Sequence, residues 1–276
     1  MQFHVPEVAA ANRHLVGPLI AELKSFAWSD VPCCVCGALR GRPAWEKEGI
    51  TVCSCESCGH LWVSPCMPGE AAAVLYSSRY WEELQPGVGS PSLEQRVEFD
   101  YGNGDYKLKR DVLPYRQAGR LLDVGASNGG LVRRARELGF QAAGLEPSAD
   151  VCALARRAHD VVMFAGTLAE QRFPDASWDV ITLHDVLEHV LDPVDELREI
   201  RRVLAPGGLF ACETPTSSSL DFADLGVEWP TLSPVEHLNY FDERNAARVL
   251  RACGFRILDL YSPHENNWIA IAEVPA

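Results

Sequence analysis

The fold is decided by ten consecutive residues, which read Leu121-Leu122-Asp123-Val124-Gly125-Ala126-Ser127-Asn128-Gly129-Gly130. The apolar residues at the start predict a buried strand, and the glycines predict a tight turn into a helix. In an open α/β sheet, ligands bind at the carboxyl ends of the strands. We therefore expect a binding loop in which Gly125 and Gly129 let the backbone approach a ligand closely.

Apolar runs alternate with helical stretches on the carboxyl side of this loop. The runs that predict strands are residues 121–124, 142–145, 161–164, 180–183 and 209–212. This alternation predicts a mostly parallel sheet with helices on both faces. Two further runs, 255–261 and 268–274, are separated by turn-forming residues and predict an antiparallel hairpin. The predicted fold class is α/β, with a seven-stranded Rossmann-like sheet closed by this hairpin.

A second carboxylate strengthens the prediction of a ligand site. Glu146 ends the next predicted strand, twenty-three residues after Asp123, where a carboxylate can accept hydrogen bonds from both hydroxyls of a ribose. Asp123 can orient a bound water or an ammonium group. Dinucleotide enzymes need a Gly-x-Gly-x-x-Gly loop for a pyrophosphate, and Gly125 is followed here by Ala126-Ser127-Asn128. The pattern favours a nucleoside ligand without a pyrophosphate.

Five blocks, in this order, resemble the core of class I S-adenosylmethionine-dependent methyltransferases. They are Asp-Val-Gly-Ala-Ser-Asn-Gly at 123–129, Glu-Pro-Ser at 146–148, Phe-Pro-Asp-Ala-Ser-Trp-Asp-Val at 173–180, His-Asp-Val-Leu-Glu-His at 184–189 and Arg-Val-Leu-Ala-Pro-Gly-Gly at 202–208. The resemblance implies that Gly125 lies under the methionine part of the cofactor, Glu146 holds the ribose and His184 lies beside the methionine group. The cofactor-binding residues that it implies are Asp123, Gly125, Ser127, Gly129, Glu146, Pro147, Gly166, Thr167 and His184.

Six of the ten cysteines lie between Cys33 and Cys58. Two Cys-x-x-Cys-Gly knuckles, at 33–37 and 55–59, predict a tetrahedral zinc site formed by Cys33, Cys36, Cys55 and Cys58. We expect the zinc to be structural, because four thiolates leave no open coordination position. Cys34 and Cys53 are spare under this assignment, and His60 is the rival ligand. Reduced cysteines without metal and a redox role for Cys33 and Cys36 are less favoured alternatives.

The chain divides into four predicted regions. We expect an N-terminal helical extension over 1–30, a zinc-ribbon-like module over 31–64, a helical connector or lid over 65–115 and the cofactor-binding domain over 116–276. The connector contains a predicted helix over 93–113, broken at Gly102-Asn103-Gly104. Tyr76, Tyr80 and Trp81 of the connector either reach the pocket or pack their helix on the core.

The segment 214–242 is longer than a minimal core requires and contains the pair Glu236-His237. Histidine titrates near neutral pH, and a neighbouring carboxylate can orient it, so the pair suits general base chemistry. The segment is similar to the Glu-His-x-x-Tyr-Phe block of zinc-containing sugar C-methyltransferases, in which this histidine is implicated as the base; those enzymes have Tyr where this chain has Pro234. A similar block occurs in glycan and small-molecule O-methyltransferases. His237 is therefore either the base or a hydrogen-bonded lid residue, and Glu188 and His189 are expected to have a structural role.

Composition limits the partners. The formal net charge is −13, which disfavours nucleic acid as a partner, and no apolar run approaches the roughly 20 residues that a membrane span needs. We expect a cytoplasmic enzyme that transfers a methyl group from S-adenosylmethionine to a small molecule such as a sugar nucleotide, glycan or natural-product scaffold. The alternatives are methylation of RNA or protein docked by the zinc module, and a non-catalytic cofactor-binding scaffold.

Overall fold

The computed structural model describes residues 6–264 and 266–275 of the chain. Residues 1–5, 265 and 276, which belong to the predicted regions 1–30 and 116–276, lie outside the described part. None of the described helices is long and apolar enough to cross a membrane.

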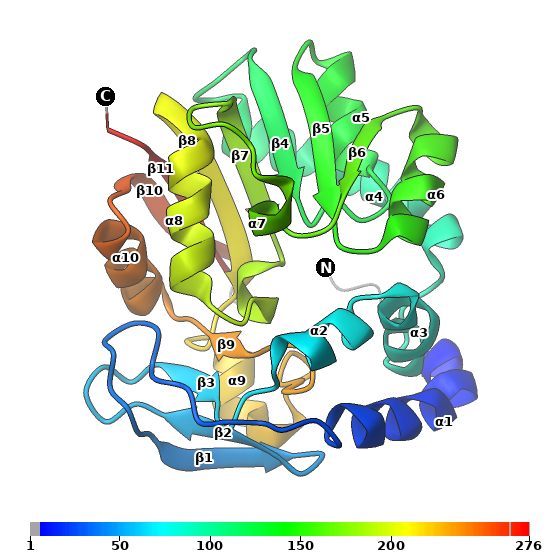
Figure 1. Ribbon diagram of the computed structural model, residues 1–276, viewed down its shortest axis with the longest axis vertical. Coiled ribbons are helices and arrows are strands. Elements are labelled where there is room, and N and C mark those ends of the chain that lie inside the picture. Colours follow the sequence, from blue (N-terminus) through cyan, green and yellow to red (C-terminus); the bar gives the residue numbers. More distant parts are fainter. Residues whose placement is uncertain (1–5, 265, 276) are drawn as a thin grey trace.

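A seven-stranded sheet forms the upper half of the molecule in Figure 1, with strand order β10-β11-β8-β7-β4-β5-β6. The strands from β8 to β6 pair in parallel, and β11 is antiparallel to both of its neighbours. Their bounds are β4 Arg120–Val124, β5 Gln141–Glu146, β6 Val162–Ala165, β7 Trp178–His184, β8 Leu204–Pro215, β10 Arg256–His264 and β11 Asn267–Glu273. This topology confirms the predicted α/β class, the mostly parallel sheet and the C-terminal hairpin.

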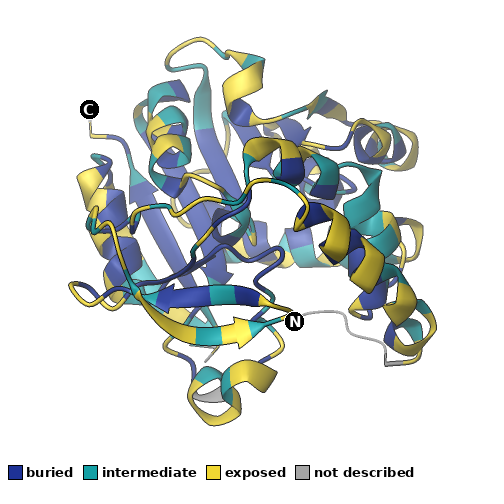
Figure 2. Ribbon diagram, turned by 60° about the horizontal axis from the view of Figure 1, so that its bottom comes forward, coloured by how far each residue is buried: buried dark blue, intermediate teal, exposed yellow. Residues whose placement is uncertain are grey.

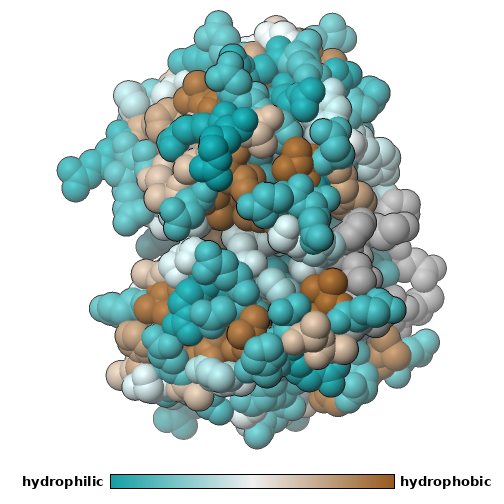
Figure 3. Space-filling model, turned by 90° about the vertical axis from the view of Figure 1, so that its right-hand side faces the viewer, coloured by the Kyte–Doolittle hydropathy of each residue, from teal (hydrophilic) through white to brown (hydrophobic). Residues whose placement is uncertain are grey.

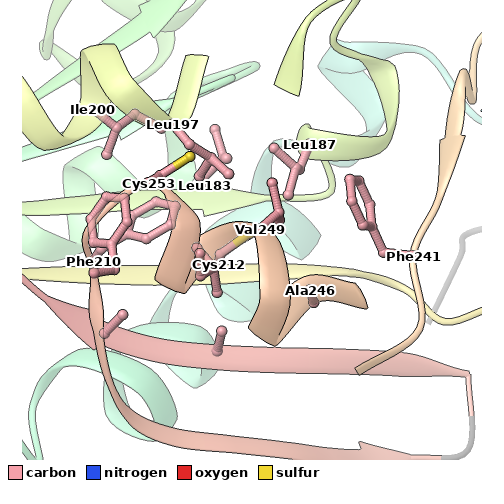
Figure 4. Close-up of a cluster of buried hydrophobic side chains, with 14 of the residues drawn as sticks. Leu183, Leu187, Leu197, Ile200, Phe210, Cys212, Phe241, Ala246, Val249 and Cys253 are labelled. Atoms are coloured by element: carbon pink, nitrogen blue, oxygen red, sulfur yellow. The ribbon is translucent and has the colours of Figure 1, made fainter. Parts of the chain in front are cut away.

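Helices cover both faces of this sheet. Apolar residues of α5, α6 and the π-helical turn η2 pack on one face, and those of α7, α8 and α10 pack on the other. Helix α4 packs on α5. The bounds are α4 Leu93–Lys107, η2 Leu108–Val112, α5 Gly130–Glu137, α6 Ala149–His159, α7 Leu168–Gln171, α8 Pro193–Val203 and α10 Glu243–Ala252. Figure 4 shows Leu197 and Ile200 of α8 near Phe210 of β8 and Val249 of α10 in one buried cluster.

Helix α4 runs without a break through Gly102-Asn103-Gly104, so the predicted interruption was wrong. The glycine at 104 serves helix packing instead. A Cβ atom at Gly104 would lie 2.6 Å from the Cα of Leu131, and one at Gly130 would lie 2.7 Å from the backbone of Tyr101. The two glycines let α4 and α5 cross in backbone contact, and this contact compensates for the low helix propensity of glycine.

The lower half of Figure 1 holds a second, four-stranded sheet with the order β1-β2-β3-β9. Three of its strands come from the cysteine-rich region, and the fourth, β9, comes from the segment after His237. The elements of this half are α1 Pro6–Leu23, β1 Arg42–Lys47, β2 Ile50–Ser54, β3 Leu61–Val63, α2 Gly69–Leu75, η1 Tyr80–Leu84, α3 Gln85–Gly87, α9 Leu220–Leu225, η4 Gly226–Glu228 and β9 Asn239–Tyr240.

One apolar cluster joins these elements. It includes Leu19 of α1, Val52 of β2, Leu75 of α2 and Trp229 of the segment before β9. Figure 2 shows the strands of the seven-stranded sheet largely in the dark blue of buried residues, whereas β1 is largely exposed. The predicted boundaries at 31–64 and 65–115 stay predictions, while the packing of this half is shared across them.

Candidate functional site

The loop after β4 turns tightly because three of its residues have positive φ. The φ angles are 75° at Gly125, 48° at Ser127 and 77° at Gly129. A Cβ atom at Gly125 would lie 2.3 Å from Cγ2 of Val186, so this position requires glycine. The amide nitrogens of Gly125 and Ala126 both donate to the carbonyl oxygen of Leu145, which fixes the loop against the end of β5.

Glu146 ends β5 and lies against this loop. Its Oε2 accepts a hydrogen bond from the amide of Ser127 at 3.1 Å, and its Oε1 accepts one from the amide of Ser148 at 3.4 Å. The side chain is buried, and burial raises the pKa of Glu146 to about 7. Pro147 leads into Ser148, whose hydroxyl caps α6. The structure thus brings the carboxylate and the loop together, and the Oγ of Ser127 is buried beside them without a hydrogen-bond partner.

The other predicted cofactor residues lie along the same edge of the sheet. Asp123 is buried, and its Oδ1 accepts a hydrogen bond of 2.6 Å from the hydroxyl of Thr182. Burial raises the pKa of Asp123. The amide of Gly166 donates to the carbonyl oxygen of Glu146. The hydroxyl of Thr167 is exposed and bonds to Glu170, so Thr167 caps α7.

His184 belongs to a charged network that sequence reasoning missed. Its Nε2 lies 3.0 Å from Oδ2 of Asp111, and Arg110 bridges Asp111 to Glu213. Lys107 completes the network, with its Nζ 2.8 Å from Asp185 and 3.5 Å from Glu213. Burial alone would raise the pKa of Asp111, but the bonds from Arg110 and His184 outweigh it and the pKa is lowered. The network joins η2 to the ends of β7 and β8.

The pair Glu236-His237 lies in a second polar cluster. The hydroxyl of Tyr80 donates to Oε2 of Glu236 at 3.0 Å, and Gln85 donates to the same oxygen at 3.2 Å. The hydroxyl of Tyr76 donates to the carbonyl oxygen of Glu236 at 3.2 Å. Tyr76 and Tyr80 therefore reach the cluster from the connector. Trp81 instead packs with Leu93, Val151 and Leu154.

The imidazole of His237 is oriented by a backbone carbonyl and not by its neighbour. Its Nδ1 lies 2.7 Å from the carbonyl oxygen of Thr231, which can only accept, so Nδ1 carries the hydrogen and Nε2 keeps a lone pair. The expected contact from the carboxylate of Glu236 to this imidazole is replaced by the bonds to Tyr80 and Gln85. The signal that sequence reasoning missed is the turn at 231–237, in which the amide of His237 donates to the carbonyl oxygen of Ser233.

Glu188 and His189 contact this cluster from the 3-10 turn η3, Leu187–His189. The imidazole rings of His189 and His237 pack edge to face, with centroids 4.7 Å apart. Burial lowers the pKa of His189 well below its ordinary value, so the ring is neutral. Burial, reinforced by the charge of Asp185, raises the pKa of Glu188 to about 8. The sequence had suggested only a structural role for these two residues.

The same turn connects the cluster to the cofactor loop. Val186 lies against Gly125, and the carbonyl oxygen of Glu188 accepts a 2.7 Å hydrogen bond from the amide of Leu238. Figure 3 shows a hollow across the molecule between the seven-stranded half above and the N-terminal half below. The loop and the cluster are thus neighbours at the edge of the sheet that faces the lower half.

The four predicted zinc ligands are brought together. The Sγ atoms of Cys33, Cys36, Cys55 and Cys58 all lie within 4.8 Å of one another. In each knuckle the glycine, Gly37 or Gly59, adopts positive φ and donates to the first cysteine's carbonyl. The spare residues lie apart from this set, because Cys34 faces Nε2 of His60 at 3.4 Å and Cys53 faces the carbonyl oxygen of Ser64. The arrangement of the four thiols suits a tetrahedral metal ion.

The cysteine module also contacts the polar cluster. Strand β3 follows the second knuckle and pairs with β9, and the amide of Val63 donates to the carbonyl oxygen of Leu238 at 2.9 Å. The side chain of Arg244 donates to the carbonyl oxygen of Cys58. The residues on both sides of β9 are therefore held by the module.

A family model described as a methyltransferase domain matches residues 103–260, which is more than half of the chain. The chain belongs to this family. The matched part of this methyltransferase-domain protein contains the loop, Glu146, His184 and the pair Glu236-His237. The N-terminal cysteines lie outside it.

Two curated relatives show which methyltransferases the chain is similar to. It is 29% identical to the malonyl-[acyl-carrier protein] O-methyltransferase of Enterobacter lignolyticus over 58% of this chain and 62% of that protein. It is also 29% identical to the ubiquinone biosynthesis O-methyltransferase of Nitrobacter winogradskyi over 54% of this chain and 62% of that protein. The chain spans under two thirds of the length of these two relatives.

Solved structures show the same fold. The [4+2]-cyclase SpnF has a TM-score of 0.52 at 23% identity, with 64% of this chain and 81% of that one covered. A SAM-dependent methyltransferase from Archaeoglobus fulgidus has a TM-score of 0.52 at 15% identity, with 65% and 98% covered. At these identities the likeness concerns the Rossmann-like fold alone.

Proposed function

We propose that this protein transfers a methyl group from S-adenosylmethionine to a small-molecule acceptor, at carbon or oxygen, such as a sugar nucleotide, a glycan or a natural-product scaffold. The observation that carries the proposal is the lone pair on Nε2 of His237, fixed by the bond from Nδ1 to Thr231, in a cluster joined to the cofactor loop through residues 186–188. A base beside the cofactor loop is what methylation of a hydroxyl or an acidic carbon requires.

The residues at the loop fit S-adenosylmethionine. The buried carboxylate of Glu146 suits the two ribose hydroxyls, and the Oγ of Ser127 lacks a partner within the protein. Asp123, Gly125, Gly129, Pro147, Gly166, Thr167 and His184 are the other residues proposed to line this site. When bound, the cofactor supplies a methyl group on a sulfonium sulfur, and the acceptor attacks the methyl carbon in line with its bond to sulfur.

On the acceptor side, the protein's own groups position the acceptor and take its proton. Nε2 of His237 accepts the proton as the new bond to the methyl carbon forms and the bond from that carbon to sulfur breaks. Glu236 is proposed to position the segment that carries His237. Its carboxylate is held by Tyr80 and Gln85, and its carbonyl oxygen accepts from Tyr76, so the segment that carries His237 is held on both sides.

We propose a structural zinc ion at Cys33, Cys36, Cys55 and Cys58. The donor set fits, because four thiols converge and the described structure shows no disulfide among the ten cysteines. The bonds from β3 and Cys58 to the segment 238–244 suggest the purpose of the module, which is to hold that segment. Cysteines kept as thiols also favour a cytoplasmic location.

The class of acceptor is supported by charge and by the relatives. A net charge of −13 disfavours RNA, and the two relatives above are O-methyltransferases by name. Methylation of a protein or an RNA docked by the cysteine module, and a scaffold without activity, are the rival functions.

The test is transfer of a labelled methyl group from S-adenosylmethionine into a cell extract, scored separately in the small-molecule and macromolecular fractions. We expect the label in small molecules, and its loss when His237→Ala replaces the unvaried protein. Label confined to RNA or protein would assign the module a docking role. Cofactor binding without any transfer would favour the scaffold.

A further inference from the structure

Three side chains that are good metal ligands meet in the polar cluster around Glu236-His237. Glu188 and His189 come from η3, and His237 comes from the segment before β9. One ligand atom from each lies within 4.8 Å of the other two, and Nε2 of His189 is 4.0 Å from Oε1 of Glu188. Zinc–nitrogen bonds are about 2.1 Å long, so neighbouring ligands of a tetrahedral ion are about 3.4 Å apart, and side-chain shifts of about 1 Å bring all three atoms into range.

Both imidazoles are oriented through their Nδ1 atoms. Nδ1 of His237 donates to the carbonyl oxygen of Thr231 at 2.7 Å, and Nδ1 of His189 donates to the carbonyl oxygen of Glu236 at 3.0 Å. Carbonyl oxygens only accept, so His237 carries its hydrogen on Nδ1 and leaves Nε2 as an acceptor. Nδ1 of His189 also lies 3.0 Å from the hydroxyl of Tyr76, so Tyr76 and the carbonyl of Glu236 together orient this ring. Histidines that bind metals are typically fixed in this way, with the other ring nitrogen donating to a carbonyl or carboxylate.

The third group is a buried carboxyl group with one unsatisfied oxygen. Glu188 is 3% exposed, and its Oε2 has no hydrogen-bond partner. Within the described residues, no lysine or arginine hydrogen bonds or ion pairs with Glu188, His189 or His237. The neighbouring set of Asp111, His184 and Glu213 has the same ligand types, but Arg110 and Lys107 already neutralise it. Glu188 and His237 are buried and His189 is half-buried, and three ligand atoms that converge in this way suit a bound cation.

We propose that Glu188, His189 and His237 bind a divalent transition-metal ion, separate from the ion at the four cysteines. Two imidazoles and one carboxylate on one side of an ion leave positions open for water or for a substrate oxygen. These donors favour zinc, iron, cobalt or nickel over magnesium or calcium, which prefer oxygen ligands. His189 is 14% exposed in its side chain, so an ion can reach the site from solvent.

The inference rests on the proposed function in one respect, which is that the acceptor occupies this side of the pocket. An ion held here would make a bound acceptor hydroxyl more acidic, and the proton would pass to solvent. The oxygen would then form the bond to the methyl carbon as the bond from that carbon to sulfur breaks. The ion and a proton compete for the same lone pair of His237. In the ion-bound enzyme, His237 holds the ion, and the ion activates the acceptor.

The experiment is cobalt titration of the full chain with zinc loaded at the cysteines, followed by elemental analysis. We expect two ions per chain at saturation. Cobalt bound to nitrogen and oxygen gives weak visible bands, whereas cobalt bound to thiolates adds intense sulfur-to-metal absorption, so the spectrum separates the two sites. This readout needs no variant and no activity.

Two variants and a reciprocal control complete the test. Glu188→Gln and His189→Ala should each weaken cobalt binding at the second site by at least about tenfold and retain the cysteine-bound zinc. Cys36→Ser should do the reverse. One ion per chain at saturation, or unchanged cobalt affinity in both pocket variants, would overturn the site. Methyl transfer by protein that holds only the cysteine-bound ion would overturn the role of the second ion and leave the proposed function standing. A second ion bound to a protein without methyl transfer would remove the proposed function alone.

Discussion

The loop after β4 and the polar cluster around Glu236-His237 lie at the same edge of the molecule but are built in different ways. The loop is made of backbone, and its parts lie within residues 123–148. Its shape is fixed by positive φ angles and by hydrogen bonds from backbone amides to the carbonyl oxygen of Leu145 and the carboxylate of Glu146. The polar cluster is made of side chains from residues 76–85, 188–189 and 236–237, which are three separate segments of the chain. A site of the second kind depends on packing between distant segments.

This difference implies that the two regions respond independently to mutation. The loop is bonded to β4 and β5, whereas the cluster is bonded to the connector and, through Leu238, to β3. Variants of the cluster should therefore change turnover without changing cofactor affinity, and variants of the loop should change affinity first.

The largest effect should follow from His237→Ala. Removal of a general base typically lowers the rate by about 100- to 10,000-fold. The affinity for S-adenosylmethionine should be unchanged, because His237 makes no bond to the cofactor loop. Turnover and calorimetric binding, measured on the same preparation, check both parts.

His14→Ala is the matched control, because His14 is an exposed histidine of α1 whose Nδ1 contacts only the carbonyl of Ala11 among the bonds described. It should leave turnover and affinity as they are. Near-normal turnover in His237→Ala would show that this residue is a part of the lid and not the base.

A tenfold effect should appear in the pH dependence of cofactor binding. Burial raises the pKa of Glu146 to about 7, above the ordinary value of 4.5, so the carboxylate is protonated as the pH falls through 7. The ionised form is the better acceptor for two ribose hydroxyls, so binding should weaken about tenfold between pH 8 and pH 6. Calorimetry over this range measures the slope.

Glu146→Gln is the control for this slope. The amide has nearly the same shape and does not titrate, so its affinity should be weaker at pH 8 and independent of pH. A slope that survives in Glu146→Gln would assign the titration to another group. An unvaried protein with constant affinity would remove the ribose role of Glu146.

The smallest effect should follow from Tyr80→Phe, which removes one hydrogen bond to the carboxylate of Glu236. A hydrogen bond contributes about 1 kcal/mol, so turnover should fall by about three- to tenfold with cofactor affinity unchanged. Tyr106→Phe is the control, since Tyr106 is 48% exposed. Weaker cofactor binding in Tyr80→Phe would show that the cluster and the loop are coupled.

Much of the fold and of the cofactor edge could be predicted because their signals are local. Alternating apolar runs gave the seven strands, and the glycines at 125 and 129 gave the turn, since positive φ is a property of single residues. The knuckles gave the four cysteines that meet. The same local reasoning was wrong at Gly102-Asn103-Gly104, where Gly104 serves the contact with α5 and α4 continues.

The sequence by itself determined the α/β class, the binding loop, the position of Glu146 and the grouping of the cysteines, because each follows from spacing within a few dozen residues. Only the tertiary structure decided that Tyr76 and Tyr80 hold Glu236, that Lys107 and Arg110 neutralise the network at His184, and that β9 joins the cysteine module to the polar cluster. The physical reason is that these contacts join segments up to 180 residues apart, as Trp62 and Asn239 show with their separation of 177 positions. Their geometry is set by the packing of two sheets, for which no local pattern in the chain exists.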